Sequence, residues 1–354
     1  MGNKLSIIFL LHCSVLISAK AQNPIAPDSV ALHINSSTTA PSLTLWQTDS
    51  CLYAQRLDSL QSEICLVYNT QVQKHIGIYT GYRKNEICNM LEQGQYYFPI
   101  FEKALKAYHI PALFKYLPVI ESALNVHAVS PSGATGLWQF MYATGKNYHL
   151  LINEYLDERK DPIQASYAAA KYIREAYNEL GDWLLALAAY NSGTGAIKRA
   201  IVKAGTKNYW QLQPYLSAQT QKYIPAFIAA TYIMEYPHRH QITASKKGTI
   251  TQVDTVYVTQ NIHLKTLNNS LSLPQHQLLL LNPSYKKGII RASPQNPQRL
   301  VIPQVTCSHY ANLYDALNGD SFVESSDSTV QINNTPIIKP EVATASAITL
   351  HVPK

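Results

Sequence analysis

Three features are missing from this sequence of 354 residues, and each absence excludes a class of protein or site. Lysine and arginine form no dense block, which argues against a nucleic-acid-binding protein. The apolar run from Leu5 to Ser18 is too short to predict a dependable membrane span. No metal or cofactor signature is present, and a CxxC-type metal site is excluded by the wide spacing of Cys51, Cys65, Cys88 and Cys307.

The first 21 residues have the pattern of a secretory signal peptide. Lys4 precedes the apolar run, and Ala19-Lys20-Ala21 forms an A-x-A cleavage site, so we expect cleavage after Ala21. Cys13 follows a bulky His12, which argues against a lipid anchor. We therefore expect an exported protein of the periplasm or cell envelope. Removal of the signal peptide lowers the net charge of +7 to +5, because the peptide carries two lysines and no acid.

Export permits disulfide bonds, so Cys51 could pair with Cys65 or Cys88, and free buried thiols are the alternative.

The chain after the signal peptide divides by composition into five segments. We expect a linker at 22–50, an N-terminal helical segment at 51–98, a helical domain at 99–240, a small module at 249–305 and a disordered tail at 325–354.

Helical periodicity dominates the sequence up to residue 240. No clear strand pattern occurs in this region. Pro99 fits the first position of a helix. Ile163 to Leu180 predicts one long helix that ends at Gly181. Leu184 to Tyr190 is apolar almost all round and must be buried, and Thr220 to Tyr236 predicts a last, largely buried helix.

One acid stands in an apolar neighbourhood near the middle of this half. Glu121 follows the apolar stretch Leu113 to Ile120, so burial should disfavour its charged form and raise its pKa. A carboxylic acid that stays protonated near neutral pH can act as a general acid. A solvated glutamate at a helix end is the alternative. Downstream we expect a loop at Ser130 to Gly133 and an amphipathic restart at Gly136 to Met141.

Three ordered motifs accompany this acid: E-S-A-L-N from Glu121, S-P-S-G-A-T-G-L-W-Q-F-M from Ser130, and A-A-Y-N-S-G-T-G at 188–195. Together they resemble the family 1 lytic transglycosylases, in particular the branch typified by membrane-bound lytic transglycosylase D. The resemblance covers about residues 67 to 240. It implies a mainly α, lysozyme-like catalytic domain of the goose-lysozyme or SLT type at 99–240. It also implies peptidoglycan glycan strands as the substrate.

The resemblance implies a mechanism with one carboxylate. Glu121 would protonate the oxygen between N-acetylmuramic acid and N-acetylglucosamine, and would then accept the proton of the muramic C6 hydroxyl. That hydroxyl attacks C1 and closes a 1,6-anhydro ring. No Asp or Glu lies between Ser122 and Asn153, so this stretch offers no second carboxylate of an ordinary glycosidase pair. We interpret the acids that follow as a solvated connection: Glu154, Asp157, Glu158 and Asp161.

The resemblance assigns contacts with the glycan to seven residues: Ser122, Ser130, Gln139, Met141, Tyr190, Asn191 and Tyr223. Structural alternatives stay open for four of them. Ser122 could bond its own helix end and Ser130 could form a Ser-Pro turn. Met141 and Tyr223 could belong to the core. We place Trp138 in the core. Related enzymes usually carry an acid where this chain has Gln219.

The region after residue 249 changes pattern. Thr249 to Thr259 alternates like a strand, Leu264 to Leu271 is helical, and Arg299 to Pro303 is a short apolar strand. This order resembles a LysM module, a small α+β fold that binds N-acetylglucosamine polymers. The usual Gly-Asp-Thr is replaced by Val253-Asp254-Thr255, so we expect a degenerate LysM-like module that either binds sugar or only packs.

We predict an exported, monomeric peptidoglycan lytic transglycosylase that has no nucleic-acid partner. The nearest alternative is a muramidase, a hydrolase on the same fold, which would leave a reducing muramic end in place of an anhydro ring. The other alternative is a glycan-binding wall protein whose catalytic half has decayed.

Overall fold

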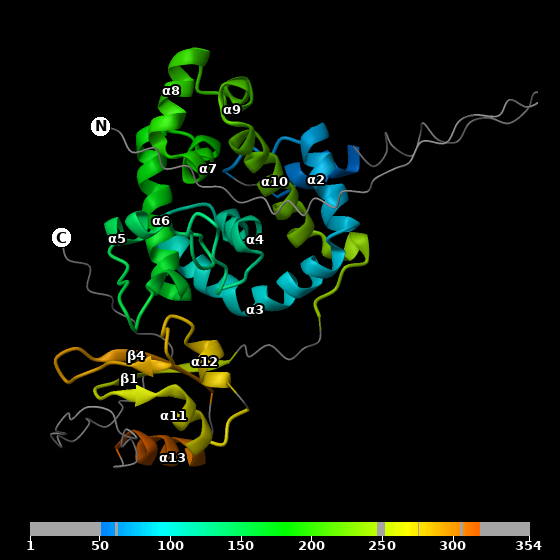
Figure 1. Cartoon of the computed structure of the whole chain (residues 1–354). Coiled ribbons are helices and arrows are strands. Elements are labelled where there is room, and N and C mark those ends of the chain that lie inside the picture. Colours follow the sequence, from blue (N-terminus) through cyan, green and yellow to red (C-terminus); the bar gives the residue numbers. More distant parts are fainter. Residues whose placement is uncertain (1–50, 61–62, 246–251, 275, 305–306, 319–354) are drawn as a thin grey trace, which may run out of the picture.

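The computed structural model describes residues 51–318, apart from 61–62, 246–251, 275 and 305–306. A helical body is followed by a smaller module that contains short strands (Figure 1). The predicted signal peptide, linker and C-terminal tail lie outside the described residues. Within the described part of the chain, no helix combines the length and the apolar character needed to cross a membrane.

A short helix at 51–58 opens the helical body. Six long helices form most of it: α2 Thr70–Thr80, α3 Lys84–Ala107, α6 Pro162–Leu180, α7 Trp183–Ser192, α8 Thr194–Ala204 and α10 Ala218–Glu235. Shorter elements connect them: η1 Ala112–Tyr116, α4 Leu117–Ser122, α5 Tyr142–Asn147, η2 Glu158–Lys160, α9 Tyr209–Leu212, η3 Gln213–Tyr215 and η4 Pro237–His240.

Helix α6 forms where the periodicity predicts it. The sequence has a start signal at its N-terminus and a stop signal at its C-terminus. The Asp161 carboxylate accepts hydrogen bonds from the backbone N–H groups of Ile163 and Gln164, and Pro162 occupies the first turn. Gly181 ends the helix in the left-handed region at φ +79°. The expectation of one helix over Ile163 to Leu180 is confirmed.

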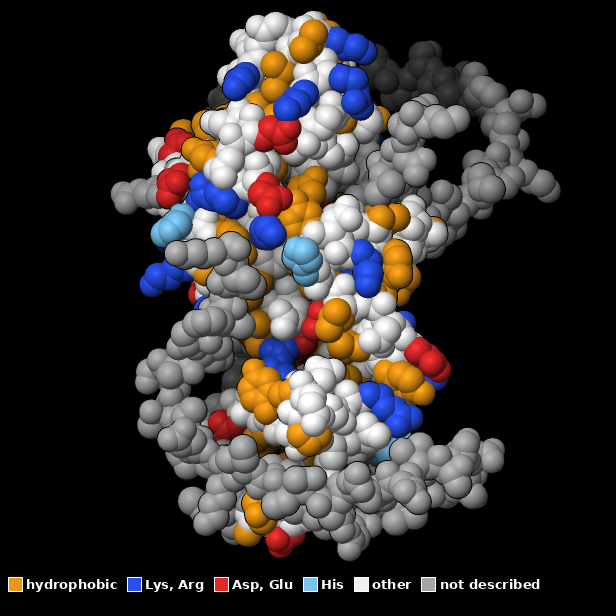
Figure 2. Space-filling view, turned by 90° about the vertical axis from the view of Figure 1, so that its left-hand side faces the viewer, with side chains coloured by type: hydrophobic (Ala, Val, Ile, Leu, Met, Phe, Trp, Pro, Cys, Tyr) orange, Lys and Arg blue, Asp and Glu red, His pale blue; other side chains and the backbone are white. Residues whose placement is uncertain are grey.

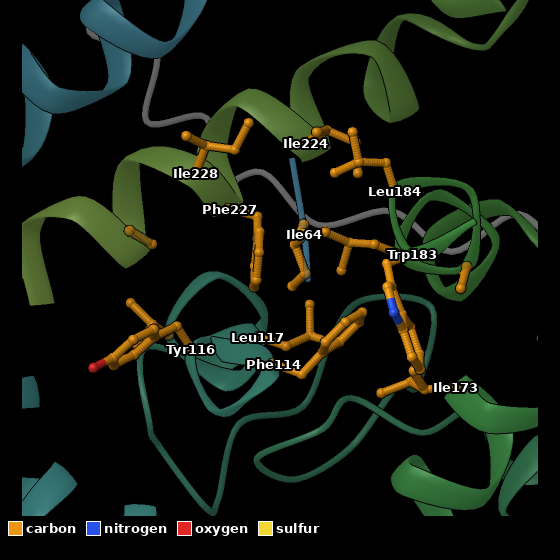
Figure 3. Close-up of a cluster of buried hydrophobic side chains, with 14 of the residues drawn as sticks. Ile64, Phe114, Tyr116, Leu117, Ile173, Trp183, Leu184, Ile224, Phe227 and Ile228 are labelled. Atoms are coloured by element: carbon orange, nitrogen blue, oxygen red, sulfur yellow. The ribbon is translucent and has the colours of Figure 1, made fainter. Parts of the chain in front are cut away.

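Helix α7 is the centre of the core. Its residues from Trp183 to Ala189 are buried, and α6, α8 and α10 pack around it. The core continues under α10, where the ring of Phe227 lies near that of Phe114, with centroids 5.9 Å apart (Figure 3). This buried layer fixes α4 and α10 relative to each other, and both helices contribute to the site described below.

The expectation that Pro99 begins a helix is wrong. Helix α3 runs from Lys84 to Ala107 and includes Pro99 in its interior. Proline removes one backbone hydrogen bond from a helix, but both Pro99 and Gln95, whose carbonyl loses its partner, are exposed. Water can therefore satisfy that carbonyl, and the helix continues.

The described residues of the module form these strands and helices: β1 Val253–Val258, β2 Ile262–His263, α11 Leu264–Ser270, α12 Gln277–Leu281, β3 Ile289–Ile290, β4 Gln298–Pro303 and α13 Cys307–Asn318. Strands β1 and β4 pair antiparallel, with Val253 opposite Pro303 and Val258 opposite Gln298. The strand expected within Thr249 to Thr259, the helix expected from Leu264 and the strand expected at Arg299 to Pro303 are confirmed as β1, α11 and β4. Helix α13, which the pattern did not indicate, adds Leu313 and Leu317 to the module's core.

The interpretation of the acidic connection as solvated is wrong for two of its four acids, whereas Glu154 is exposed as expected and Glu158 is half-buried. Asp157 and Asp161 are buried, with 3% and 8% of their surfaces exposed. The loop between α5 and α6 reaches the module (Figure 1), and Leu156 forms an antiparallel bridge with Tyr285. Figure 2 shows acidic and basic side chains next to each other where the two parts meet. Arg299 of the module bonds the Asp161 side chain and Ser284 bonds the Asp157 backbone, so the module helps to bury these two acids.

Cys51, Cys65 and Cys88 form no disulfide bond. Cys51 and Cys65 are exposed free thiols, and Cys88 is a half-buried free thiol. The structure therefore has neither of the two possible disulfides, and none of these free thiols is fully buried. The side chain of Cys307 lies outside the described residues.

Candidate active site

Glu121 lies at the end of the short helix α4. Pro118 occupies the first turn of that helix, so the helix starts at the proline rather than being kinked by it. Two and three residues after the acid, Ala123 and Leu124 adopt left-handed backbone conformations at φ +52° and +58°. Each costs roughly 1–2 kcal/mol in a residue with a Cβ atom. The fully buried side chain of Leu124 helps to offset that cost and anchors the turn.

The Glu121 carboxyl group is hydrogen-bonded by a residue of α10. The Tyr223 hydroxyl donates to Oε1 of Glu121. Burial raises the pKa of Glu121 to about 7, and the bond from Tyr223 opposes that rise by favouring the carboxylate. Glu121 itself keeps part of its surface accessible to solvent. The result is an acid that is partly protonated at neutral pH and can be approached from outside.

Tyr190 lies beside this acid at the end of α7. Its hydroxyl donates a 2.7 Å hydrogen bond to the carbonyl of Trp138. Burial and, after it, the negative charge of Glu121 raise the pKa of Tyr190 well above 10, so the phenol stays protonated. Its ring packs edge-on against Tyr172, with centroids 5.3 Å apart. Tyr190 therefore connects α7 to the segment that contains Trp138.

Residues 130–141, hereafter the motif loop, form a tight hairpin-like turn. The expectation of an amphipathic helical restart at Gly136 to Met141 is wrong. Thr135 and Phe140 exchange backbone hydrogen bonds of 3.0 and 3.1 Å, and helix α5 begins only at Tyr142. Gly136 has φ +84°, and a Cβ atom there would lie 1.9 Å from the carbonyl oxygen of Arg159. Only glycine fits this position, so the chain turns there.

Ser130 and Gln139 are held inside the motif loop by backbone partners. The Ser130 hydroxyl oxygen accepts a 2.8 Å hydrogen bond from the N–H of Ala134. Nε2 of Gln139 donates to the carbonyl oxygens of Gly136 at 2.8 Å and Ala128 at 3.3 Å. These contacts use the acceptor side of the Ser130 hydroxyl and both amide protons of Gln139. The hydroxyl proton of Ser130 and the amide oxygen of Gln139 are left to bond a ligand.

The other expected contact residues differ in their surroundings. The Ser122 hydroxyl lies 2.9 Å from the carbonyl oxygen of Leu137 and 3.1 Å from that of Pro118, so it fastens α4 to the motif loop. Asn191 is buried, and its Oδ1 accepts a 3.0 Å bond from the Thr220 hydroxyl. Met141 is half-buried at the N-terminus of α5, so it is not a core residue.

Trp138 occupies the core, as expected. It is fully buried, its indole N–H donates to the hydroxyl of Ser166 at 2.8 Å, and its ring meets Phe101 edge-on. The structure thus brings Tyr223 into direct contact with Glu121, and it places Tyr190 near enough for the charge of Glu121 to raise its pKa. It connects Ser122 to them through the motif loop. No property of the isolated sequence indicated that Tyr223 rather than Ser122 would contact the carboxyl group.

Arg159 is a residue of this site that the sequence analysis missed. Its Nη1 donates to the carbonyl oxygens of Gly133 at 3.1 Å and Phe140 at 3.4 Å, at the two ends of the turn in the motif loop. Asp157 holds the guanidinium through hydrogen bonds of 2.9 and 2.8 Å. An Asp-x-Arg sequence is too common to indicate such a contact without the fold.

The raised pKa of Glu121 predicts an effect of pH on stability. Between about pH 4.5 and 7 the folded state holds a proton that the unfolded state has lost, so the wild type loses stability as pH rises through this window. Glu121→Gln should therefore be more stable than the wild type above pH 7, by on the order of 2–3 kcal/mol, and similar to it near pH 4. Denaturant unfolding at both pH values measures this. An equal difference at both would contradict the raised pKa.

Two family models match the chain. Residues 98–213 match the model described as "Transglycosylase SLT domain", and residues 252–319 match "Lytic transglycosylase MltD, LysM-like domain". The helical body therefore contains a transglycosylase SLT domain, and the module is LysM-like, as the sequence motifs predict.

The chain is also similar to proteins of known name or structure. Membrane-bound lytic murein transglycosylase D of Escherichia coli K12 is 28% identical over 239 residues, which cover 66% of this chain and 51% of that protein. The chain thus spans about half the length of this relative. A protein of phage PRD1 named "Transglycosylase" is 39% identical over 89 residues, 25% of this chain and 30% of its own length. The 70 kDa soluble lytic transglycosylase of Escherichia coli matches at 18% identity and a TM-score of 0.36, over 58% of this chain and 36% of that one.

Proposed function

We propose that this chain, with its SLT and MltD-type LysM-like domains, is a peptidoglycan lytic transglycosylase with Glu121 as its single acid and base. The observation on which the proposal rests is the environment of this carboxyl group. Its pKa is moved by burial and by the Tyr223 hydroxyl, and neither influence comes from another carboxylate. A glycosidase pair would place a second acid about 5–10 Å away, where its charge would affect the first.

The chemistry then proceeds in two proton transfers by one residue. Protonated Glu121 gives its proton to the oxygen between N-acetylmuramic acid and N-acetylglucosamine, and the bond from that oxygen to C1 breaks. The carboxylate that remains accepts the proton of the muramic C6 hydroxyl as its oxygen bonds to C1. The proton count on Glu121 returns to its starting value, and no water is consumed. The Tyr223 hydroxyl stabilises the carboxylate between the two steps, when it carries charge.

Polar groups of the motif loop and of α7 are suited to hold the glycan. The Ser130 hydroxyl proton and Oε1 of Gln139 offer a donor and an acceptor, the combination that the substrate's acetamido and hydroxyl groups require. Asn191 presents its amide beside Thr220. Ser122 and Tyr190 contribute by fixing the motif loop. Met141, half-buried at the start of α5, offers an apolar contact at the edge of the same loop.

We also propose that the protein acts in the cell envelope, where its substrate is found. The proposal is supported by the secretory pattern of the first 21 residues and by similarity to a relative named membrane-bound. The identification of the N-terminus of the mature protein would test it. Gln22 as the first residue is the expected result.

The pH dependence of the rate tests the proposed role of Glu121. The release of soluble fragments from peptidoglycan, as kcat/KM, should fall as pH rises through about 7, because the acid must be protonated to begin the reaction. Gln219 lies four residues before Tyr223 on α10, and therefore on the same helix face. Gln219→Glu would place a negative charge there and should move this fall to higher pH, by about half a unit to one unit. A profile that is flat from pH 5 to 9 would contradict the proposal.

A further inference from the structure

The segment 153–161, hereafter the junction segment, is joined to the LysM-like module by its backbone. The N–H of Asp157 donates to the carbonyl oxygen of Ser284 at 2.8 Å, and the N–H of Lys286 donates to that of Tyr155 at 2.8 Å. Ser284 is 3% exposed, so this pairing is shielded from water. The module is therefore hydrogen-bonded to the junction segment as a neighbouring strand would be.

A charged pair strengthens this junction. Arg299 of β4 donates to Oδ2 of Asp161, while Oδ1 of Asp161 caps helix α6. Both side chains of the pair are largely buried, with 18% and 11% of their surfaces exposed. Loss of the arginine would leave a buried carboxylate without its partner, which destabilises the junction strongly. A second pair, Lys287 with Glu154, lies in solvent and should contribute little.

The opposite side of the junction segment holds the motif loop. Arg159 donates to the carbonyl oxygens of Gly133 and Phe140, and its own carbonyl oxygen packs against Gly136. Asp157 fixes the guanidinium with both carboxylate oxygens. Asp157 thus has two partners at once: its backbone bonds the module and its side chain bonds Arg159.

The motif loop in turn contacts both neighbours of the acid. The Ser122 hydroxyl lies 2.9 Å from the carbonyl oxygen of Leu137, and Tyr190 donates to that of Trp138. The contacts therefore run without a gap from the module, through Asp157 and Arg159, to the turn that holds Gln139 and to the residues beside Glu121.

We propose that Asp157 and Arg159 are positioning residues for the motif loop, and that the docked LysM-like module holds them in place. The module then acts on catalysis through its contact with the junction segment, whether or not it binds sugar. The expected effect on turnover rests on the proposed function. The coupling between the module and the motif loop can be measured without turnover.

Hydrogen exchange of the full chain, followed by mass spectrometry, tests the coupling. Arg299→Gln should speed exchange in the peptides that contain the amides of Ala134, Thr135 and Phe140 by about tenfold, although it lies in the module. The matched control is Lys287→Gln, which removes one positive charge from the exposed pair and should leave these peptides unchanged. Exchange in the motif loop that is the same in both variants and in the wild type would overturn the inference.

Steady-state turnover tests the consequence. Arg159→Lys keeps the positive charge, but a lysine cannot bond two carbonyl oxygens and both oxygens of the Asp157 carboxylate at once. KM for glycan should therefore rise about tenfold. The pH at which the rate falls should not move, since no charge near Glu121 changes. A role in stability alone would reduce the folded fraction, seen as a lower kcat at an unchanged KM, and would contradict the inference.

The double variant Arg159→Lys with Arg299→Gln tests whether the two residues act through the same contacts. If both residues act through the same contacts, its KM should be no higher than that of the more affected single variant. Independent, multiplying effects would overturn the coupling. If the wild type itself lacks turnover, the proposed function fails, and the exchange experiment still decides the inference.

Discussion

Glu121→Gln should lower the rate of fragment release from peptidoglycan by about a thousandfold. Glutamine keeps the size of the side chain and can still accept the hydrogen bond from Tyr223, but it has no proton to transfer at either step. A positioned general acid contributes about 10²–10⁴-fold, and here the same group also serves as the base. Turnover of purified peptidoglycan, measured from the soluble muropeptides, gives the ratio.

Glu235→Gln is the matched control for this experiment. Glu235 is also on the helical body and also accepts a hydrogen bond from a tyrosine, since the Tyr116 hydroxyl lies 2.7 Å from its Oε1. The same chemical change is made there in a similar pair away from the site. Activity near that of the wild type is expected for Glu235→Gln. Equal losses in the two variants would mean that a damaged fold, and not the missing acid, explains the first result.

Tyr223→Phe should lower kcat by about 10- to 100-fold and move the fall of the rate to a higher pH. The Tyr223 hydroxyl favours the carboxylate form of Glu121, so its removal should raise the pKa of that acid above about 7. It also removes a hydrogen bond to a charged group, which contributes about 1.5–3 kcal/mol. The pH profile of kcat and kcat/KM measures both effects.

Tyr209→Phe controls for the loss of a buried hydroxyl. The Tyr209 hydroxyl donates to the backbone carbonyl of Thr220 at 3.2 Å, on the same helix α10, and does not contact Glu121. The variant should keep the wild-type pH profile. A shift of the profile in Tyr209→Phe of the same size as in Tyr223→Phe would show that the effect comes from α10 as a whole.

The sequence predicted the helices that carry their own start and stop signals. Asp161, Pro162 and Gly181 define α6 without help from the rest of the fold. The uniformly apolar α7 could be assigned to the core for the same local reason. Pro99 was misjudged because its effect depends on which side of α3 meets water, a property of the packed structure.

The site could be predicted only in part. Burial of Glu121 follows from its apolar neighbours, and the structure bears out the raised pKa. The motif loop could not be predicted as a turn, since its shape depends on Gly136 lying against Arg159, more than 20 residues away in the chain. The burial of Asp157 and Asp161 in the junction segment could not be predicted for a similar reason. Their partners, Ser284 and Arg299, are contributed by a different domain.

Mass spectrometry of fragments released from purified peptidoglycan in water enriched in oxygen-18 tests whether Glu121 is the single acid and base. If Glu121 acts alone as acid and base, the fragments end in 1,6-anhydro-N-acetylmuramic acid and contain no oxygen-18 at that end, because the attacking oxygen comes from the sugar. Reducing muramic ends labelled with oxygen-18 would contradict the account and identify a hydrolase. Binding to peptidoglycan with no fragments released would contradict any enzymatic role.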